Sequence, residues 1–187
     1  MFSVCVPYRR LETRPRFLGN CLMRLNETGF EICIGGEKQE GRFNRAAALN
    51  EAISKASREW IIAMDVDLIW PEDFIKKIKG FLDKRTYLCF LFVENGEARL
   101  PGTAGGLNIF HKSLWEAAEK FCEEYIGYGW EDFDFCNRVL AKGFEVRQTE
   151  ITIEHIPHEQ IEGIFEDLDN NRKIYESKWG RGEEECE

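Results

Sequence analysis

The sequence lacks several features that mark common protein classes. Its seven cysteines include no C-x-x-C pair, and an odd number of scattered thiols is typical of a reduced chain rather than a disulfide-stabilised secreted domain. No apolar stretch reaches the ~20 residues that a membrane span needs. The opening MFSVCVPYRR has too short an apolar run for a signal peptide. We therefore expect a cytoplasmic protein with no membrane span.

Positive charge is also scarce. The chain has 25 Lys and Arg against 34 Asp and Glu, a formal net charge of −9. General nucleic-acid binding depends on clustered Lys and Arg, so this balance argues against a nucleic-acid partner. Residues 1–60 nevertheless hold 10 basic and 7 acidic side chains, which suits a small anionic ligand.

The length of 187 residues predicts a single domain over residues 1–187. Apolar residues alternate between the period of strands and that of helices, which predicts an α/β fold with a mostly parallel sheet flanked by helices. Strands are expected at residues 2–6, 31–34, 60–64, 87–93, 107–110, 144–146 and 151–153, and helices at 15–27, 43–53, 71–82, 112–124, 131–142 and 161–178. Residues 159–187 are predicted to form a polar helical extension.

An acidic pair, Asp65-Val66-Asp67, directly follows the buried strand at residues 60–64. Ligands of an open parallel sheet bind beyond the carboxyl ends of its strands, where this pair would lie. Two such carboxylates can hold Mg²⁺ or Mn²⁺ together with diphosphate oxygens. The same tripeptide also occurs as a simple cap of a loop, or of a helix starting at Pro71, so by itself it leaves both interpretations open.

A second segment, residues 127–134 with the sequence GYGWEDFD, places glycines and two aromatics before three acids that open a helix. Acids in a first helical turn are common as caps and dipole partners. The glycines and aromatics suggest more, because glycine lets backbone approach a ligand and aromatic faces suit a sugar ring or a base. Downstream, His155 or His158 could complete a metal site begun by Asp67, whereas His111 is interpreted as structural.

Taken together, these motifs resemble a known family. The motifs are Val6-Pro7-Tyr8-Arg9, Phe43-Asn44-Arg45-Ala46, Asp65-Val66-Asp67, Gly105-Gly106, and GYGWEDFD with a downstream His. In this order they are similar to the β1,4-galactosyltransferase and chondroitin-polymerase group of GT-A inverting glycosyltransferases, and to family 2 glycosyltransferases more broadly. The likeness runs from about residue 3 to residue 158, and it implies a GT-A, Rossmann-like fold.

The resemblance also implies roles for individual residues. Contacts with the donor nucleotide would come from Pro7, Tyr8, Arg9, Arg45, Asp65 and Val66. The donor and acceptor sugars would be lined by Gly105, Gly106, Tyr128, Trp130 and Glu131. Metal ligands would be Asp67 and His155, with Asp65 and His158 as further candidates, and the cofactor Mn²⁺ or Mg²⁺. In the catalytic site, Asp132 would be the base and Glu131 would hydrogen-bond sugar hydroxyls.

Two positions depart from the family pattern. Tyr128 stands where the family often has Trp, and Thr152 stands where the galactosyltransferases have a metal-binding Met. The stacking of the acceptor would therefore change in detail. The third protein ligand of the metal, and with it the preference for Mn²⁺, is left open by the motif.

The function implied by the resemblance is metal-dependent, inverting transfer of a hexose or N-acetylhexosamine from a UDP-sugar to a hydroxyl of a glycan or another acceptor. One alternative is a sugar nucleotidyltransferase, although those enzymes have a Gly-rich loop where this chain has Pro7-Tyr8-Arg9-Arg10. A dinucleotide dehydrogenase is disfavoured because no G-x-G-x-x-G follows a strand. A binding module that holds a sugar nucleotide or glycan without transferring the sugar is the non-enzymatic alternative.

Overall fold

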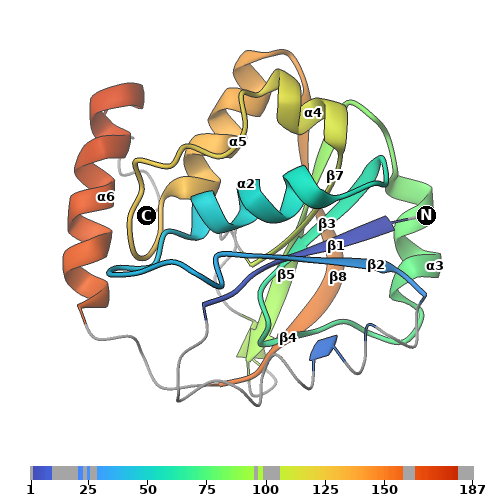
Figure 1. The fold of residues 1–187 in the computed structure, drawn as a ribbon. Helices are drawn as coiled ribbons and strands as arrows, with labels where there is room; N and C mark the ends of the chain where they lie inside the picture. Colours follow the sequence, from blue (N-terminus) through green and yellow to red (C-terminus); the bar gives the residue numbers. More distant parts are fainter. Residues whose placement is uncertain are drawn as a thin grey trace.

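The computed structural model describes residues 2–9, 21–22, 25, 29–94, 97–98, 106–157 and 163–180. Within these residues the chain forms one mixed sheet with helices packed against it (Figure 1). No helix of the described part is long and apolar enough to cross a membrane. The predicted helix at residues 15–27 lies mostly outside the described residues, although Cys21 and Leu25 are buried as its apolar pattern predicts.

The described residues contribute eight strands to the sheet. They are β1 (Phe2–Pro7), β2 (Glu31–Gly35), β3 (Trp60–Met64), β4 (Leu68–Ile69), β5 (Thr86–Glu94), β6 (Glu97–Ala98), β7 (Leu107–His111) and β8 (Glu145–His155). Their order is β2-β1-β3-β7-β5-β8-β4, with β6 paired to β5. The two strands expected at 144–146 and 151–153 are one strand, β8, whose pairing with β5 shifts register between Cys89 and Leu91.

The α/β class is as predicted, but the sheet is mixed instead of mostly parallel. β1 runs parallel to β2 and β3, and β5 runs parallel to β8. β7 is antiparallel to both of its neighbours, β3 and β5. The reason is the connection: parallel neighbours need a long crossover, usually a helix, and the sequence between residues 93 and 107 is short and shows no helical periodicity. The chain therefore returns in the opposite direction.

Five described helices flank the sheet. They are α2 (Arg45–Lys55), α3 (Phe74–Ile78), α4 (Lys112–Ala117), α5 (Glu131–Ala141) and α6 (Ile164–Trp179), with a 3₁₀ turn at Lys79–Phe81. The start of α2 is fixed by Asn44, whose side chain accepts a hydrogen bond of 2.8 Å from the Ala47 N–H. α4 ends well before the predicted residue 124 because Glu119 and Lys120 adopt φ values of 63° and 64°, which a helix cannot contain.

Alternation along the strands divides the core between the two faces of the sheet. On β5, Tyr87 and Cys89 face the layer of α2, α4 and α5, where they pack with Phe135. The intervening Leu88 and Phe90 belong to the cluster on the opposite face, which contains α3. Figure 1 shows α2, α4 and α5 on one side of the sheet and α3 on the other. The sheet is thus packed against apolar side chains on both faces.

Helix α6 lies beside α5 instead of on the sheet (Figure 1). Asn137 of α5 donates a 2.7 Å hydrogen bond to the Tyr175 hydroxyl, and Trp179 Nε1 donates one of 2.9 Å to Asp134. A helix therefore exists at Ile164–Trp179 within the predicted polar extension, and one of its faces packs against the helix that carries Glu131 and Asp132. Residues 159–162 and 181–187 of that extension lie outside the described residues.

Candidate active site

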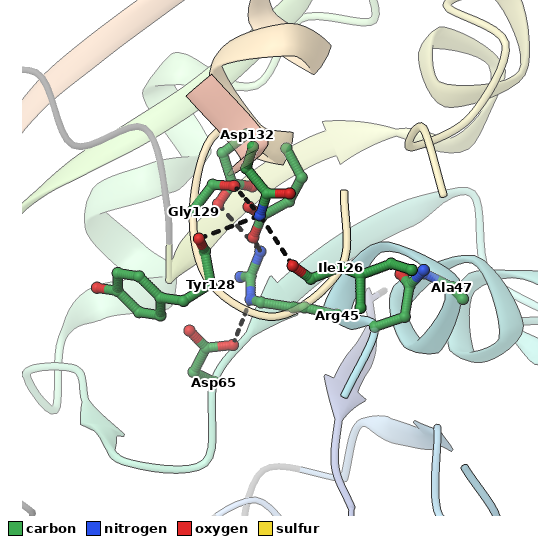
Figure 2. A network of polar contacts seen from close by, with 10 residues as sticks. Arg45, Ala47, Asp65, Ile126, Tyr128, Gly129 and Asp132 are labelled. Carbon is green, nitrogen blue, oxygen red and sulfur yellow. Dashed lines mark hydrogen bonds and ion pairs between the residues drawn. The ribbon is translucent and has the colours of Figure 1, made fainter. Parts of the chain in front are cut away.

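Arg45, the first residue of α2, lies at the centre of the polar network drawn in Figure 2. Its Nε donates to Asp65 Oδ1 at 2.9 Å. Its Nη1 lies 3.1 Å from Glu131 Oε1 and 3.0 Å from Asp132 Oδ2. Asp65 follows β3, and both Glu131 and Asp132 open α5. One guanidinium thus joins three carboxylates from segments that are 20 to 87 residues away in the sequence.

The electrostatics of this cluster leave Asp132 suited to proton transfer. Burial raises the pKa of Asp132 to about 7, and the nearby charges of Glu131 and Asp65 add to this effect, while Arg45 opposes it. Burial also acts to lower the pKa of Arg45, but the carboxylates of Asp132, Asp65 and Glu131 outweigh it and hold that pKa well above its ordinary value. The guanidinium therefore stays charged at every physiological pH.

The two oxygens of Asp132 are in different situations. Oδ2 accepts the hydrogen bond from Arg45, whereas Oδ1 is buried and has no hydrogen-bond partner in the described part of the chain. A buried acceptor without a donor is costly unless a ligand supplies one. A substrate hydroxyl group is a suitable donor to this oxygen, so the arrangement fits a general base.

Asp67 and His155 meet through a strand pair that the sequence pattern does not reveal. β4 has only two residues, and its Leu68 pairs with His155 of the antiparallel β8. The Ile156 N–H donates to the Asp67 carbonyl at 2.8 Å. As a result, His155 Nε2 lies 3.9 Å from Asp67 Oδ2.

This pair fits a divalent cation. Two metal bonds of about 2.1 Å span roughly 3.0 Å at a right angle and roughly 4.2 Å in a straight line, and the observed 3.9 Å lies between these limits. Carboxylate and imidazole are both ligands that Mn²⁺ and related ions accept. Among the described residues, however, no group of three His, Cys, Asp or Glu side chains gathers as a metal cluster. A bound ion would take its remaining ligands from the substrate and water.

The glycine pair at 105–106 is described only in part. The Gly106 carbonyl accepts a 2.8 Å hydrogen bond from the Asp65 N–H. Gly106 has a φ of 89°, and an added Cβ would lie 3.0 Å from the Phe92 ring, so glycine is needed there on both grounds. Gly106 is thus placed beside the acidic pair, whereas Gly105 and His158 lie outside the described residues.

The predicted nucleotide-binding residues of the first strand lie at its carboxyl end. Pro7 closes β1, and the buried Tyr8 donates its N–H to the Gly35 carbonyl at 2.9 Å. The Arg9 guanidinium donates to the Gly41 carbonyl and lies 5.9 Å from the centre of the Phe43 ring. Val66 is buried between the two acids of the Asp-x-Asp motif.

The resemblance implies that Arg45 contacts the nucleotide base. In the structure its side chain is engaged with the three carboxylates, which places it between the acidic pair after β3 and the start of α5. The role that the structure indicates for Arg45 is to hold and tune the neighbouring acids.

The Gly-aromatic segment forms a tight loop before α5. Gly127, Gly129 and Trp130 all have positive φ, and the value of 76° at Trp130 is unusual for a bulky residue. The Trp130 ring packs on Tyr175 of α6 with centroids 5.0 Å apart, while Tyr128 is 46% exposed. Strained backbone of this kind clusters at functional sites, and the loop leaves the Tyr128 side chain about half exposed.

Sequence reasoning missed the α6 residues that contact this loop. Asp167, Asn171, Tyr175 and Trp179 recur every four residues, which places them on one face of a helix. That spacing was the available signal. It did not identify a buried face because two of the four side chains are strongly polar, and polar periodicity is equally typical of a face open to solvent.

Comparison with solved structures establishes the fold class. The catalytic domain of Drosophila β1,4-galactosyltransferase 7, in complex with xylobiose, matches with a TM-score of 0.70 and 21% identity, over 91% of this chain and 79% of that one. Residues 1–349 of TarS from S. aureus match with a TM-score of 0.63 and 14% identity, over 95% of this chain and 64% of that one. These neighbours are GT-A glycosyltransferases, which confirms the predicted fold.

Comparison with known sequences then identifies the family. The family model described as glycosyl transferase family 2 matches residues 14–130. Human β-1,4-galactosyltransferase 2 is 27% identical over 161 residues, which cover 81% of this chain and 42% of that protein. The chain therefore belongs to glycosyl transferase family 2, and it spans about two fifths of the length of such curated relatives.

Proposed function

We propose that this protein transfers a hexose or N-acetylhexosamine from a UDP-sugar to an acceptor hydroxyl, with inversion at the sugar C1 and with Asp132 as the base. Membership of glycosyl transferase family 2 supports sugar transfer. One structural neighbour was solved with manganese, UDP-Gal and xylobiose, and TarS was solved with UDP-GlcNAc. Both complexes favour a UDP-linked donor.

The observation that carries the proposal is the convergence of Asp65, Glu131 and Asp132 on Arg45, together with one oxygen of Asp132 that accepts no hydrogen bond from the described residues. In a single displacement, Asp132 Oδ1 takes the proton of the acceptor hydroxyl. The acceptor oxygen forms its bond to C1 as the bond from C1 to the UDP oxygen breaks on the opposite face. UDP leaves with the bonding electrons, and Asp132 returns its proton to water.

Asp67 and His155 are the residues that would hold a divalent cation next to the donor. When bound, such an ion stabilises the negative charge that develops on the leaving diphosphate. The 3.9 Å separation of the two side chains and their partly buried setting support this assignment. Asp65, bonded to Arg45, remains a candidate ligand through its other oxygen.

The first experiment incubates the protein with UDP-Gal, UDP-GalNAc, UDP-Glc and UDP-GlcNAc, each with Mn²⁺ or Mg²⁺, and measures release of UDP with and without sugar acceptors. Transfer with at least one donor is expected. Donor-induced thermal stabilisation without UDP release would instead indicate the non-enzymatic binding module.

The second experiment tests the base. General-base catalysis contributes about 10²–10⁴-fold in rate, so Asp132→Asn should slow transfer by that factor while the affinity for the donor changes little. Asp73→Asn, an exposed carboxylate paired with Lys77, serves as the control and should behave as the wild type. Near-normal turnover of Asp132→Asn would remove Asp132 from this role.

A further inference from the structure

Asn171 of α6 donates hydrogen bonds to the loop at residues 126–130, which precedes α5. Its side-chain Nδ2 lies 3.0 Å from the carbonyl oxygen of Ile126 and 3.1 Å from those of Tyr128 and Gly129. Figure 2 shows the three carbonyls pointing inward to one nitrogen, with Tyr128 at the outside of the loop. Asn171 is only 2% exposed, so its two N–H hydrogens are fully committed to this shared contact.

Asp167, one turn earlier on α6, holds the same loop from a second side. Its Oδ2 accepts a 3.1 Å hydrogen bond from the Tyr128 N–H. The same carboxylate pairs with the Arg42 guanidinium, at 2.9 Å from Nε and 2.6 Å from Nη2. Asp167 therefore links the loop both to α6 and to the segment that leads into α2.

Gly127 and Gly129 lack a Cβ where side chains of α6 approach the loop. A Cβ added to Gly127 would overlap the Asp167 carboxylate, and one added to Gly129 would lie 2.7 Å from a methyl carbon of Leu168. Both glycines also have positive φ. The expectation that these glycines admit a ligand to the backbone therefore has a competing explanation, because at both positions the space is occupied by α6.

The loop held in this way leads straight into the catalytic carboxylates. Trp130 is the residue before α5, and the Asp134 N–H bonds back to the Trp130 carbonyl at 3.0 Å. Glu131 and Asp132 follow at once. On the other side of the site, Asp65 and Asp67 follow β3. The hydrogen bonds of Asn171 and Asp167 thus fall on the aromatic loop that precedes α5 and on Arg42.

We propose that Asn171 and Asp167 are positioning residues for the acceptor: they hold the loop that carries Tyr128 in the geometry that an acceptor sugar needs. Asp132, by contrast, is held by Arg45, so the two α6 residues have little influence on the donor. This inference rests on the proposed function. It predicts a division of effects, in which loosening the contacts of α6 weakens acceptor binding while reaction of the donor with water continues.

The decisive variant is Asn171→Asp, which keeps the shape of the side chain but places carboxylate oxygen next to three carbonyl oxygens. With xylobiose or the best acceptor of a monosaccharide panel, we expect the acceptor KM to rise at least tenfold. We expect UDP-sugar hydrolysis without acceptor to stay within about twofold of the wild type, and amide hydrogen exchange at residues 127–130 to accelerate.

Two further variants complete the design. Asp167→Asn retains an acceptor for the Tyr128 N–H but weakens the pair with Arg42, so a smaller rise in acceptor KM is expected. Asp169 lies on the same helix, and its exposed side chain pairs with Lys173. The control variant Asp169→Asn should match the wild type in every measurement.

The possible failures can be told apart. If wild-type protein transfers sugar and Asn171→Asp keeps the wild-type acceptor KM, the inference is wrong and the proposed function stands. A fall in melting temperature with unchanged KM would likewise assign α6 a purely structural role. If the wild type transfers no sugar from any donor, the proposed function fails. Unchanged amide hydrogen exchange at residues 127–130 in Asn171→Asp would, independently of any activity, show that Asn171 does not hold the loop.

Discussion

Removing the charge of Arg45 should shift the pH dependence of transfer to more alkaline values. A base must be deprotonated to act, so with Asp132 as the proposed base the rate should rise with pH through the pKa of Asp132, which is about 7. Arg45 Nη1 lies 3.0 Å from Asp132 and acts to lower that pKa. Without the guanidinium, burial and the charges of Glu131 and Asp65 would act unopposed, and the pKa of Asp132 would rise.

The size of the effect follows from these charges. An opposite charge at this distance typically changes the pKa of a carboxyl group by about 1–3, so a value of about 9 is expected in Arg45→Met. At pH 7.5, a base with a pKa of about 7 is roughly three-quarters ionised, whereas one with a pKa of about 9 is about 3% ionised. Transfer by Arg45→Met should therefore be about 25-fold slower at pH 7.5 and recover most of this loss above pH 9.

Two controls separate this effect from loss of structure. Removing the partner of buried charges can cost about 3–5 kcal/mol, so circular dichroism and thermal melting must show that Arg45→Met is folded at each pH used. Arg45→Lys retains the positive charge without the several N–H donors of the guanidinium. The midpoint of its pH–rate profile should stay near 7 while its kcat falls. Lys55→Met, at the exposed far end of α2, should behave as the wild type.

The assay is the initial rate of UDP release at saturating donor and acceptor between pH 5.5 and 9.5, with the same metal throughout. If folded Arg45→Met shows the same midpoint as the wild type, Arg45 does not set the protonation of Asp132. A midpoint that moves to lower pH would contradict the electrostatic reasoning altogether.

Two other perturbations test the donor side and the core. Asp67→Ala should weaken UDP-sugar binding measured by calorimetry with Mn²⁺ and leave the binding measured with EDTA unchanged. Equal affinity of the variant and the wild type for the UDP-sugar with Mn²⁺ would refute the metal assignment. Asp73→Ala is the control. Asn50→Leu removes the acceptor of hydrogen bonds of 3.1 Å from Trp115 Nε1 and 3.0 Å from the Phe121 N–H, so the free energy of unfolding should fall by about 2–6 kcal/mol. Urea denaturation measures it, and a loss below about 1 kcal/mol would show that these buried donors find other partners.

Sequence reasoning located most of the fold because its signals are local. The apolar runs of β1, β3 and β7 and the helical spacing of α2 and α5 each lie within one short window, so their periodicity identifies them without knowledge of their neighbours. β4 could not be predicted because its two residues are too few to show the alternation of apolar and polar side chains that identifies a strand. The direction of β7 was missed because strand direction depends on the connection between strands, which apolar patterning does not describe.

The candidate site divides in the same way. The family resemblance implies that the motifs at residues 65–67 and 131–132 belong to one site, and the acidic pair also lies at a strand end, where α/β folds bind ligands. Their order along the chain was also readable. What the motifs could not supply was the partner of each side chain. The link between Asp67 and His155 depends on the pairing of β4 with β8, which is a contact between distant segments.

By itself, then, the sequence determined the α/β class, the family resemblance and the chemical types of the site residues, since residue identity and spacing are properties of the chain alone. Only the tertiary structure decided that Arg45 joins the carboxylates of two segments and that α6 holds the loop before α5. The physical reason is that charge pairing and buried hydrogen bonds act over a few ångströms in space. Those distances exist only after residues far apart in the sequence have been brought together.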